Sequence, residues 1–242
     1  MPKRELEMDR KSIQENVRIE SIEKDVVIYR YGRGEKTILL VHGWSGRGTQ
    51  LVKFADAFAK AGYSILSFDA PAHGKSPEKT SIMPEFIATI LQLEKQYGPF
   101  EAAVGHSLGG MSLLNSVKRG LKIRRLVTIG SGDVIQEIID EFIEKLGLKP
   151  NVGQIMRRQF EMKSHESMDE YSAWRAAKSI DIPVLVIHDY DDIEVSVKCA
   201  GHIHENLKHG ELMLTRGLGH RKILGHSDVI GKTLRFITEN NA

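Results

Sequence analysis

The sequence has little of what marks a secreted, membrane-spanning or nucleic-acid-binding protein. It contains a single cysteine, Cys199, which excludes an intramolecular disulfide. Its formal net charge is only +2, so no strong field favours nucleic acid or an anionic membrane as a partner. No apolar run approaches the length of a membrane-spanning helix, and the N-terminus lacks the apolar segment of a signal peptide. We therefore expect a cytoplasmic protein with no membrane span and no nucleic-acid partner.

Short apolar runs alternate with longer amphipathic stretches after residue 35. The runs predict strands near residues 37–42, 63–68, 100–105, 124–129, 182–188 and 211–215. This alternation is typical of a mainly parallel sheet that helices cover on both faces. Before it, residues 17–23 and 25–31 are expected to form an antiparallel hairpin. The fold class that we predict is therefore α/β.

A serine between two glycines follows one of these strands. The stretch Gly105-His106-Ser107-Leu108-Gly109 stands between an apolar run and a helix-like segment, which is the pattern of a nucleophile elbow. A strand that turns at once into a helix strains the serine backbone, and the glycines leave room for the turn. We predict that Ser107 is the catalytic nucleophile and that the N–H of Leu108, at the helix N-terminus, is one oxyanion donor.

An acid candidate follows a later strand, in the order that such a nucleophile requires. Three aspartates lie after the run at 182–188, and a carboxylate there has the role of orienting a histidine. We predict Asp192 in this role, with Asp191 as the alternative. Asp189 and Asp191 are otherwise expected to be turn or helix-cap residues, because the next helix is expected to begin at Val195.

The base candidate follows the strand at 211–215. His220 ends the stretch Gly217-Leu218-Gly219-His220, where two glycines free the backbone to bring an imidazole over the sheet edge. We predict that His220 is the base and keep His226 in reserve. Other histidines are expected to be surface or core residues: His165, His188, His202, His204 and His209. No cysteine or carboxylate cluster at ligand spacing accompanies them, so we expect no metal and no cofactor.

A second oxyanion donor is expected in the loop after the first parallel strand. The stretch His42-Gly43-Trp44-Ser45-Gly46 begins there, and Gly43 lets the backbone approach the site closely. We predict the N–H of Trp44 as the donor and its indole as one wall of an acyl pocket. His42 is interpreted as a residue that holds this loop by packing and hydrogen bonding.

Together these motifs resemble the α/β-hydrolase superfamily, over about residues 24 to 240. The resemblance rests on His42-Gly43-Trp44, the loop from Phe68 to Ser76, the elbow at Ser107, the Asp192 loop and Gly219-His220. The loop is similar to the family's D-x-P-G-H-G-x-S pattern, with Ala72 in place of its first glycine. A serine nucleophile separates this chain from the haloalkane dehalogenases and epoxide hydrolases of the family, which have aspartate there. The resemblance implies an α/β-hydrolase fold with a mostly parallel central sheet flanked by helices.

The connection between the strands at 124–129 and 182–188 is too long for a simple crossover helix. In this superfamily the same place carries a cap over the active site. We therefore expect a core domain of residues 1–130 and 179–242 and a small helical cap of residues 131–178, inserted before the acid-bearing strand.

One face of the expected cap carries an apolar stripe at helical spacing. Packing on the sheet edge and contact with an acyl chain explain this stripe equally well. The side chains expected to line an acyl site are Trp44, Met111, Ile138 and Phe142.

These residues predict a serine esterase that acts through a Ser-His-Asp triad and an acyl-enzyme. A thioesterase or a carbon–carbon bond hydrolase would use the same triad, and Arg157-Arg158 is the basic pair at the cap that favours such substrates. A non-catalytic ligand-binding protein on the same fold is a third hypothesis. The expected partner is a small acyl ester, and the sequence leaves the acyl group, the alcohol and the oligomeric state open.

Overall fold

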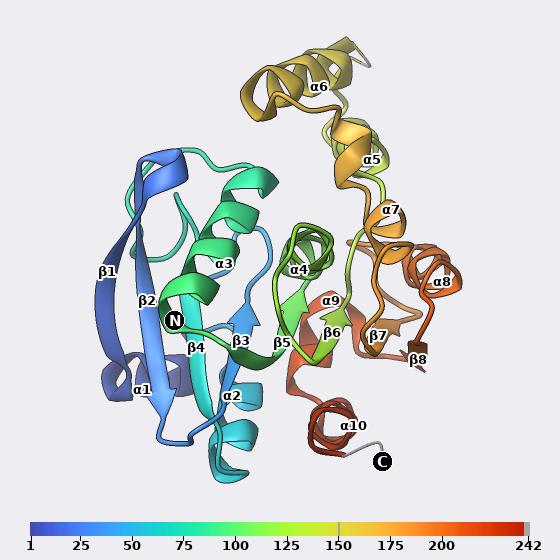
Figure 1. Cartoon of the computed structure of the whole chain (residues 1–242). Helices are drawn as coiled ribbons and strands as arrows, with labels where there is room; N and C mark the ends of the chain where they lie inside the picture. The colour runs from blue at the N-terminus through green and yellow to red at the C-terminus, as the bar shows by residue number, and fades with distance from the viewer. Residues whose placement is uncertain (150, 240–242) are drawn as a thin grey trace.

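An eight-stranded sheet forms the centre of the chain in a computed structural model, which describes residues 1–149 and 151–239 (Figure 1). The strands run in the order β1-β2-β4-β3-β5-β6-β7-β8, and β2 is antiparallel to both of its neighbours, whereas the pairs from β4 to β8 are parallel. Their bounds are β1 Ile13–Ile19, β2 Lys24–Gly32, β3 Thr37–Val41, β4 Ser64–Asp69, β5 Phe100–His106, β6 Arg125–Ile129, β7 Val184–Asp189 and β8 Gly210–Thr215. The predicted α/β fold with a mostly parallel sheet is confirmed.

The opening hairpin forms, but its first strand has other bounds than the alternation suggests. The strand begins at Ile13 and ends at Ile19, and residues 20–22 form a short 3-10 turn instead of continuing it. Glu23 closes that turn with a φ of 52°, in the left-handed region, which is incompatible with a strand. The residues before the hairpin form helix α1, Lys3–Lys11.

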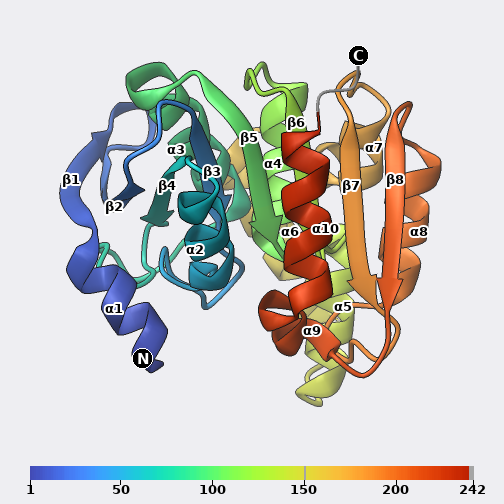
Figure 2. The ribbon, with the colours of Figure 1, turned by 90° about the horizontal axis from the view of Figure 1, so that it is seen from below.

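Helices cover both faces of the sheet, and alternate strand residues supply the two apolar layers between them. Ile38 and Leu40 of β3 belong to the layer under α1, α2 (Val52–Lys60) and α10 (Ser227–Thr238). Leu39 and Val41 belong to the layer under α3 (Met83–Tyr97), α4 (Leu108–Lys118), α7 (Ala173–Ala177) and α8 (Val197–Glu205). This period of two is the pattern of a strand that is buried on both faces. In Figure 2, α10 lies in front of the sheet and runs alongside the strands.

Helix α8 begins two residues later than the sequence suggests. Its N-cap is Ser196, whose hydroxyl accepts the N–H of Lys198, and its first residue is Val197. The expected start at Val195 is wrong, because the N–H of Val195 donates to the carboxylate of Asp192 at 2.9 Å.

Two helices of the connection from β6 to β7 extend beyond the sheet. Helix α6 (Asn151–Ser164) is the uppermost element in Figure 1, and α5 (Ile135–Lys145) lies directly below it. The apolar stripe of α5 is divided, since Ile143 is buried while Ile138 and Phe142 are exposed. Helix α7, at the end of the same connection, packs on α4 through buried alanines in the helical layer.

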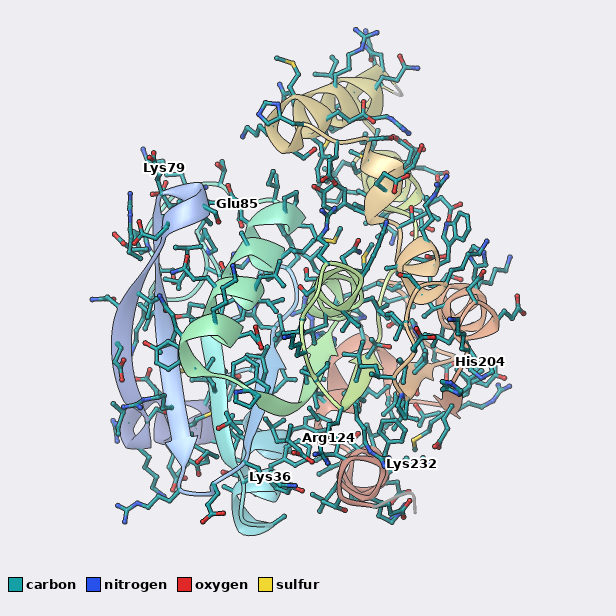
Figure 3. The ribbon with its side chains drawn as sticks, viewed as in Figure 1. Lys36, Lys79, Glu85, Arg124, His204 and Lys232 are labelled. Atoms are coloured by element: carbon teal, nitrogen blue, oxygen red, sulfur yellow. The ribbon has the colours of Figure 1, made fainter. Side chains whose placement is uncertain are left out.

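Three basic residues near residue 120 are paired with carboxylates. Lys118 lies 3.2 Å from a carboxylate oxygen of Glu170, and Arg119 contacts Glu166 at 2.5 Å. Arg124 lies near Lys36, as Figure 3 shows, and both contact Glu101. Exposed pairs of this kind contribute little to stability. Across residues 1–149 and 151–239, no helix combines the length and the apolar character that crossing a bilayer requires.

A pair of glycine substitutions tests how closely α4 packs on the sheet. A Cβ on Gly109 would overlap the carbonyl oxygen of Val41, so Gly109→Ala should lower the free energy of unfolding by about 1–3 kcal/mol. A Cβ on Gly201 of α8 would meet open space, so Gly201→Ala should raise the free energy of unfolding by about 0.5–1 kcal/mol. Urea titration of both variants measures the difference. Equal effects of the two substitutions would contradict the close packing of α4.

Candidate active site

The turn from β5 into α4 holds Ser107 in a strained backbone conformation. Its φ of 52° and ψ of −122° lie where residues with a side chain are rare. A Cβ on Gly105 would lie 2.6 Å from the backbone of Gly109, which explains the glycine there. Ser107 is half-buried, and its N–H donates to the carbonyl of Ile129 on the neighbouring strand β6. The expected nucleophile therefore stands at the carboxyl end of β5, in the middle of the sheet.

His220 and Asp192 are in direct contact beyond the ends of β8 and β7. Nδ1 of His220 lies 2.7 Å from Oδ2 of Asp192, and both side chains are almost fully buried. The other oxygen, Oδ1, accepts the N–H groups of Glu194 and Val195, each at 2.9 Å. Because a carboxylate only accepts, Nδ1 of His220 carries the proton in the neutral ring, and Nε2 is free to accept another.

The surroundings of Asp192 keep it ionised. Burial acts to raise the pKa of its carboxyl, but the N–H groups of His188, His220 and Val195 outweigh burial and hold this pKa below its usual range. An ionised carboxylate at Nδ1 stabilises the imidazolium that forms when Nε2 takes up a proton.

The other two aspartates of this loop hold the histidine loop in place. Asp189 accepts the N–H of Gly219 at 3.0 Å, and Asp191 accepts the N–H of Gly217 at 2.8 Å. Both glycines have a positive φ, 60° and 79°, which other residues rarely adopt. The structure thus brings Asp192, and not Asp191, against His220. Asp189 and Asp191, the expected turn or cap residues, thus link the end of β7 to the loop after β8.

Strand β6 ends between the nucleophile and the histidine. A Cβ on Gly130 would lie 3.3 Å from Nδ1 of His220, and Ser107 bonds to the preceding residue, Ile129. The short helix α9 (Gly219–Lys222), which carries His220, lies at the end of the sheet toward which the arrowheads of β7 and β8 point in Figure 2. Between the described side chains of Ser107 and His220, no hydrogen bond joins Oγ to Nε2. Such contacts commonly tighten only when substrate binds.

The loop after β3 lies directly against the Ser107 turn. A Cβ on Gly43 would lie 2.8 Å from Cβ of Ser107, so a larger residue would displace the loop. Nε2 of His42 accepts the N–H of Ala70 at 3.0 Å, and its Nδ1 therefore donates to the carbonyl of Gly43 at 2.7 Å. Because the C=O and N–H of a trans peptide point in opposite directions, this bond directs the N–H of Trp44 away from His42.

Two backbone N–H groups near Ser107 are available to an incoming ligand. Within residues 1–149 and 151–239, neither Trp44 nor Leu108 donates its N–H to a protein acceptor. Leu108 is the first residue of α4, so the positive end of the helix dipole lies there. The indole of Trp44 is 58% exposed and meets the ring of His73 edge-on, with 5.3 Å between ring centroids.

Sequence reasoning misses two buried histidines beside the His220–Asp192 pair. Nε2 of His106 donates to the carbonyl of His220 at 2.9 Å, and the two ring centroids are 4.5 Å apart. Nε2 of His188 lies 3.4 Å from Oδ2 of Asp192. The signal that points to them is position, because His106 directly precedes Ser107 and His188 lies four residues before Asp192.

Two of the side chains expected to line an acyl site lie beside the same glycine, Gly132. A Cβ on Gly132 would lie 2.7 Å from Cδ1 of Ile138 and 3.1 Å from Sδ of Met111. Met111 is buried. Phe142 lies one turn after Ile138 on α5 and is 53% exposed. The structure therefore places Met111 and Ile138 beside Gly132 and leaves Phe142 and Trp44 largely exposed.

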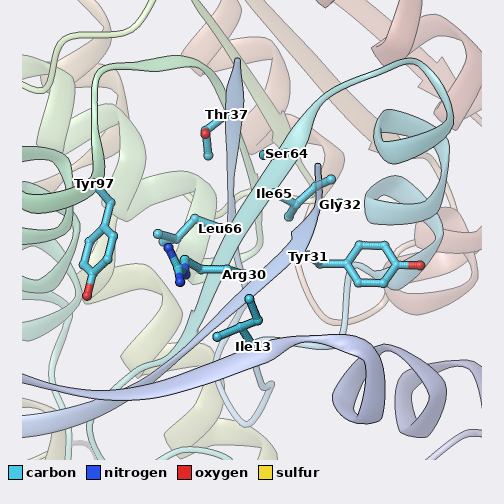
Figure 4. A pocket seen from close by; sticks show the side chains of 9 residues that line it. All are labelled: Ile13, Arg30, Tyr31, Gly32, Thr37, Ser64, Ile65, Leu66 and Tyr97. Carbon is cyan, nitrogen blue, oxygen red and sulfur yellow. The ribbon is translucent and has the colours of Figure 1, made fainter. Parts of the chain in front are cut away.

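A surface cavity of about 240 Å³ lies at the opposite end of the sheet (Figure 4). Thr37 and Ser64, the first residues of β3 and β4, line it together with Tyr97 of α3. Because Ser107 lies at the carboxyl ends of the strands, this cavity is not part of the candidate site. In the part of the chain that the structure describes, no group of three His, Cys, Asp or Glu side chains is placed to hold a metal ion.

Two buried histidines predict a fold that loses stability in acid. Burial lowers the pKa of both His42 and His106 to about 3, from 6.5 in an exposed histidine. As pH falls from 6.5 toward 3, the unfolded chain binds protons at these residues that the folded chain does not, so the free energy of unfolding falls throughout this window.

Urea titrations between about pH 7 and about pH 5 give the slope of the unfolding free energy against pH. In His106→Gln this slope should decrease by up to about 1.4 kcal/mol per pH unit, because the unfolded chain binds one proton fewer. An unchanged slope would show that His106 binds a proton in the folded protein.

Comparison with known proteins identifies relatives among hydrolases and related enzymes. The chain is 33% identical over 110 residues to a 2-hydroxy-6-oxononadienedioate/2-hydroxy-6-oxononatrienedioate hydrolase of Paraburkholderia phymatum, covering 42% of this chain and 38% of that protein. It is 28% identical over 114 residues to the dihydrolipoyllysine-residue acetyltransferase component of an acetoin cleaving system of Cupriavidus necator, covering 44% of this chain and 30% of that protein. The matches thus span about a third of the length of these curated relatives.

Solved structures share the fold at low sequence identity. A bromoperoxidase from Bacillus anthracis aligns with a TM-score of 0.71 and 17% identity over 94% of this chain and 100% of that one. An esterase from Exiguobacterium antarcticum aligns with a TM-score of 0.73 and 14% identity over the same shares. The family model described as alpha/beta hydrolase fold matches residues 36–163, more than half of the 242 residues. The chain therefore belongs to the alpha/beta hydrolase fold family.

Proposed function

We propose that this chain is a serine hydrolase that cleaves a carboxylic ester through an acyl-enzyme on Ser107. The observation that supports this most is that three kinds of group lie at the carboxyl ends of the parallel strands. These are a strained serine, an imidazole whose Nδ1 faces the ionised Asp192, and the two free N–H groups of Trp44 and Leu108.

Each group has one role in the proposed reaction. Nε2 of His220 takes the proton from Oγ of Ser107 as Oγ attacks the ester carbonyl carbon. The N–H groups of Trp44 and Leu108 donate to the oxyanion that forms, and Asp192 stabilises the imidazolium. His220 then gives its proton to the leaving alcohol. Water, deprotonated by the same imidazole, releases the acid and restores the serine.

We further propose a core domain of residues 1–130 and 179–242 and a cap of residues 131–178. The position of α5 and α6 beyond the sheet, with Ile138 and Phe142 exposed, supports such a cap. In this arrangement Trp44, Met111, Ile138 and Phe142 contact the acyl chain, because their side chains are apolar and three of them are exposed.

Carbon–carbon bond hydrolysis is the second candidate, because one relative is named for that class of substrate. An acidic substrate of that kind needs a cation at its carboxylate. Arg157, one of the two basic residues expected at the cap, is neutralised by Glu161 at 3.0 Å and Asp169 at 2.8 Å. This pairing removes Arg157 as a free cation for an acidic substrate, and only Arg158 of the pair is left for that role.

Covalent labelling tests the proposed nucleophile. The purified protein should react with a fluorophosphonate and hydrolyse p-nitrophenyl esters, and Ser107→Ala should lose the labelling and about 10⁶ of kcat, because no other group supplies the attacking oxygen. Labelling is read by mass spectrometry, and a panel from acetate to palmitate gives the preferred chain length. Labelling that persists in Ser107→Ala would contradict the assignment. If the wild type neither labels nor turns over, the non-catalytic binding function gains support.

A matched pair of substitutions tests the acid. Asp192→Asn should lower kcat on a p-nitrophenyl ester by about 10⁴, because the amide favours the wrong imidazole tautomer. Asp191→Asn, one residue away, keeps an acceptor for the N–H of Gly217 and should change kcat by less than about tenfold. Steady-state kinetics of the two variants decide the matter, and near-normal turnover in Asp192→Asn would exclude Asp192 as the acid.

A further inference from the structure

A second histidine, His188 near the end of β7, lies against the carboxylate that orients His220. Its side chain is fully buried, and that of Asp192 is 1% exposed. Nε2 of His188 lies 3.0 Å from the carbonyl oxygen of Val195 and 3.4 Å from Oδ2 of Asp192. Because both neighbours only accept, Nε2 must carry the proton, and the tautomer of His188 is fixed.

The other ring nitrogen of His188 shows that packing alone does not account for this residue. Nδ1 is buried, and the described residues supply no hydrogen-bond partner for it. A buried polar atom without a partner lowers stability, and an aliphatic side chain at this strand position would avoid that cost. The N–H at Nε2 is what a histidine provides here and an aliphatic residue does not.

The contacts of Nε2 act on the part of the acid loop that faces His220. The N–H donates to the carbonyl of Val195, and the N–H of Val195 in turn donates to Oδ1 of Asp192. Nε2 of His188 also lies 3.4 Å from Oδ2, which Nδ1 of His220 contacts at 2.7 Å, so the positive end of the His188 N–H lies beside this carboxylate oxygen. His188 therefore limits both the rotation of the carboxylate and the negative charge that it presents to His220.

We propose that His188 is a positioning residue for ester hydrolysis, which acts through Asp192 to hold the carboxylate in the orientation that His220 requires. This inference rests on the proposed function of Ser107, Asp192 and His220.

Two titratable neighbours of the pair have a shifted pKa that keeps each in one charge state near neutral pH. Burial lowers the pKa of His106, on β5, to about 3, so this ring stays neutral. Asp189, on β7, stays ionised, since Thr215 and the N–H of Gly219 outweigh its burial and lower its pKa. On α9, the guanidinium of Arg221 is paired with a carboxylate, that of Glu194, at 3.1 Å. The remaining neighbour, Asp191, accepts a backbone N–H from the histidine loop.

Two substitutions at position 188 separate the N–H from the volume of the ring. His188→Leu removes the donor, whereas His188→Gln places an amide N–H near the position of Nε2. With p-nitrophenyl butyrate as the probe, His188→Leu should lower kcat about tenfold and change KM by less than about twofold. The acid limb of its profile of kcat/KM against pH should move up by about half a unit, because the carboxylate has lost a donor and becomes more basic toward His220.

His188→Gln should restore kcat to within about threefold of wild type and return the acid limb to its original position. The matched control is Thr128→Val on β6, which removes a buried hydroxyl without a partner among the described residues and should leave the pH profile unchanged. Urea titration of all variants reports whether each one is folded.

The possible outcomes separate this inference from the function on which it rests. An active wild-type enzyme with unchanged kinetics in His188→Leu overturns the role of His188 alone. Equal losses in His188→Leu and His188→Gln, with an unmoved pH profile, also overturn it, because they indicate a packing role. Turnover that survives in Ser107→Ala overturns the proposed function, and this inference with it.

Discussion

The close packing of α4 on the ends of β3 and β5 is the constraint on which the candidate site depends. No side chain fits between Gly109 and the carbonyl of Val41, or between Gly105 and the first turn of α4. This packing forces the sharp turn of the backbone at Ser107, which has a positive φ. Strained backbone conformations of this kind cost about 1–3 kcal/mol. The strain persists because β5 and α4 are buried in the middle of the molecule and cannot relax separately.

The loops after β3 and β8 are fixed near Ser107 by buried polar groups as well as by packing. His42 holds the peptide that presents the N–H of Trp44, and Asp189 holds the turn that presents His220. Each of these groups is almost fully buried and bonds to backbone, so each determines where a loop lies. Catalysis by oriented dipoles requires groups that are in place before the substrate arrives. In the proposed hydrolase, the loops at the carboxyl ends of the parallel strands meet this requirement.

The sequence predicts the parts of the site that local patterns encode. Glycines around Ser107 and before His220 reveal where the backbone must turn sharply, and apolar runs locate the strands that carry them. Alternation places β1 wrongly at its start, because the pairing of Ile13 with Arg30 extends the strand into a polar segment. A strand's length is set by its partner, and no pattern within the strand reveals that.

Tertiary contacts determine what the sequence does not predict. His106 meets the carbonyl of His220, a residue in a distant loop, and the contact of His188 with Asp192 depends on how the loop after β7 turns back. The roles of Asp189 and Asp191 depend on glycines 30 and 26 residues further along the chain. The apolar stripe of α5 has one periodicity, but only the fold shows that Ile143 is covered and Phe142 is not.

A crystal structure of the protein after reaction with a fluorophosphonate tests the central claim most directly. The proposed mechanism predicts that phosphorus is bonded to Oγ of Ser107. One phosphoryl oxygen should lie about 2.7–3.1 Å from the N–H groups of both Trp44 and Leu108, where an oxyanion would lie. Phosphorus on another residue, or a phosphoryl oxygen that faces away from both N–H groups, would contradict the account.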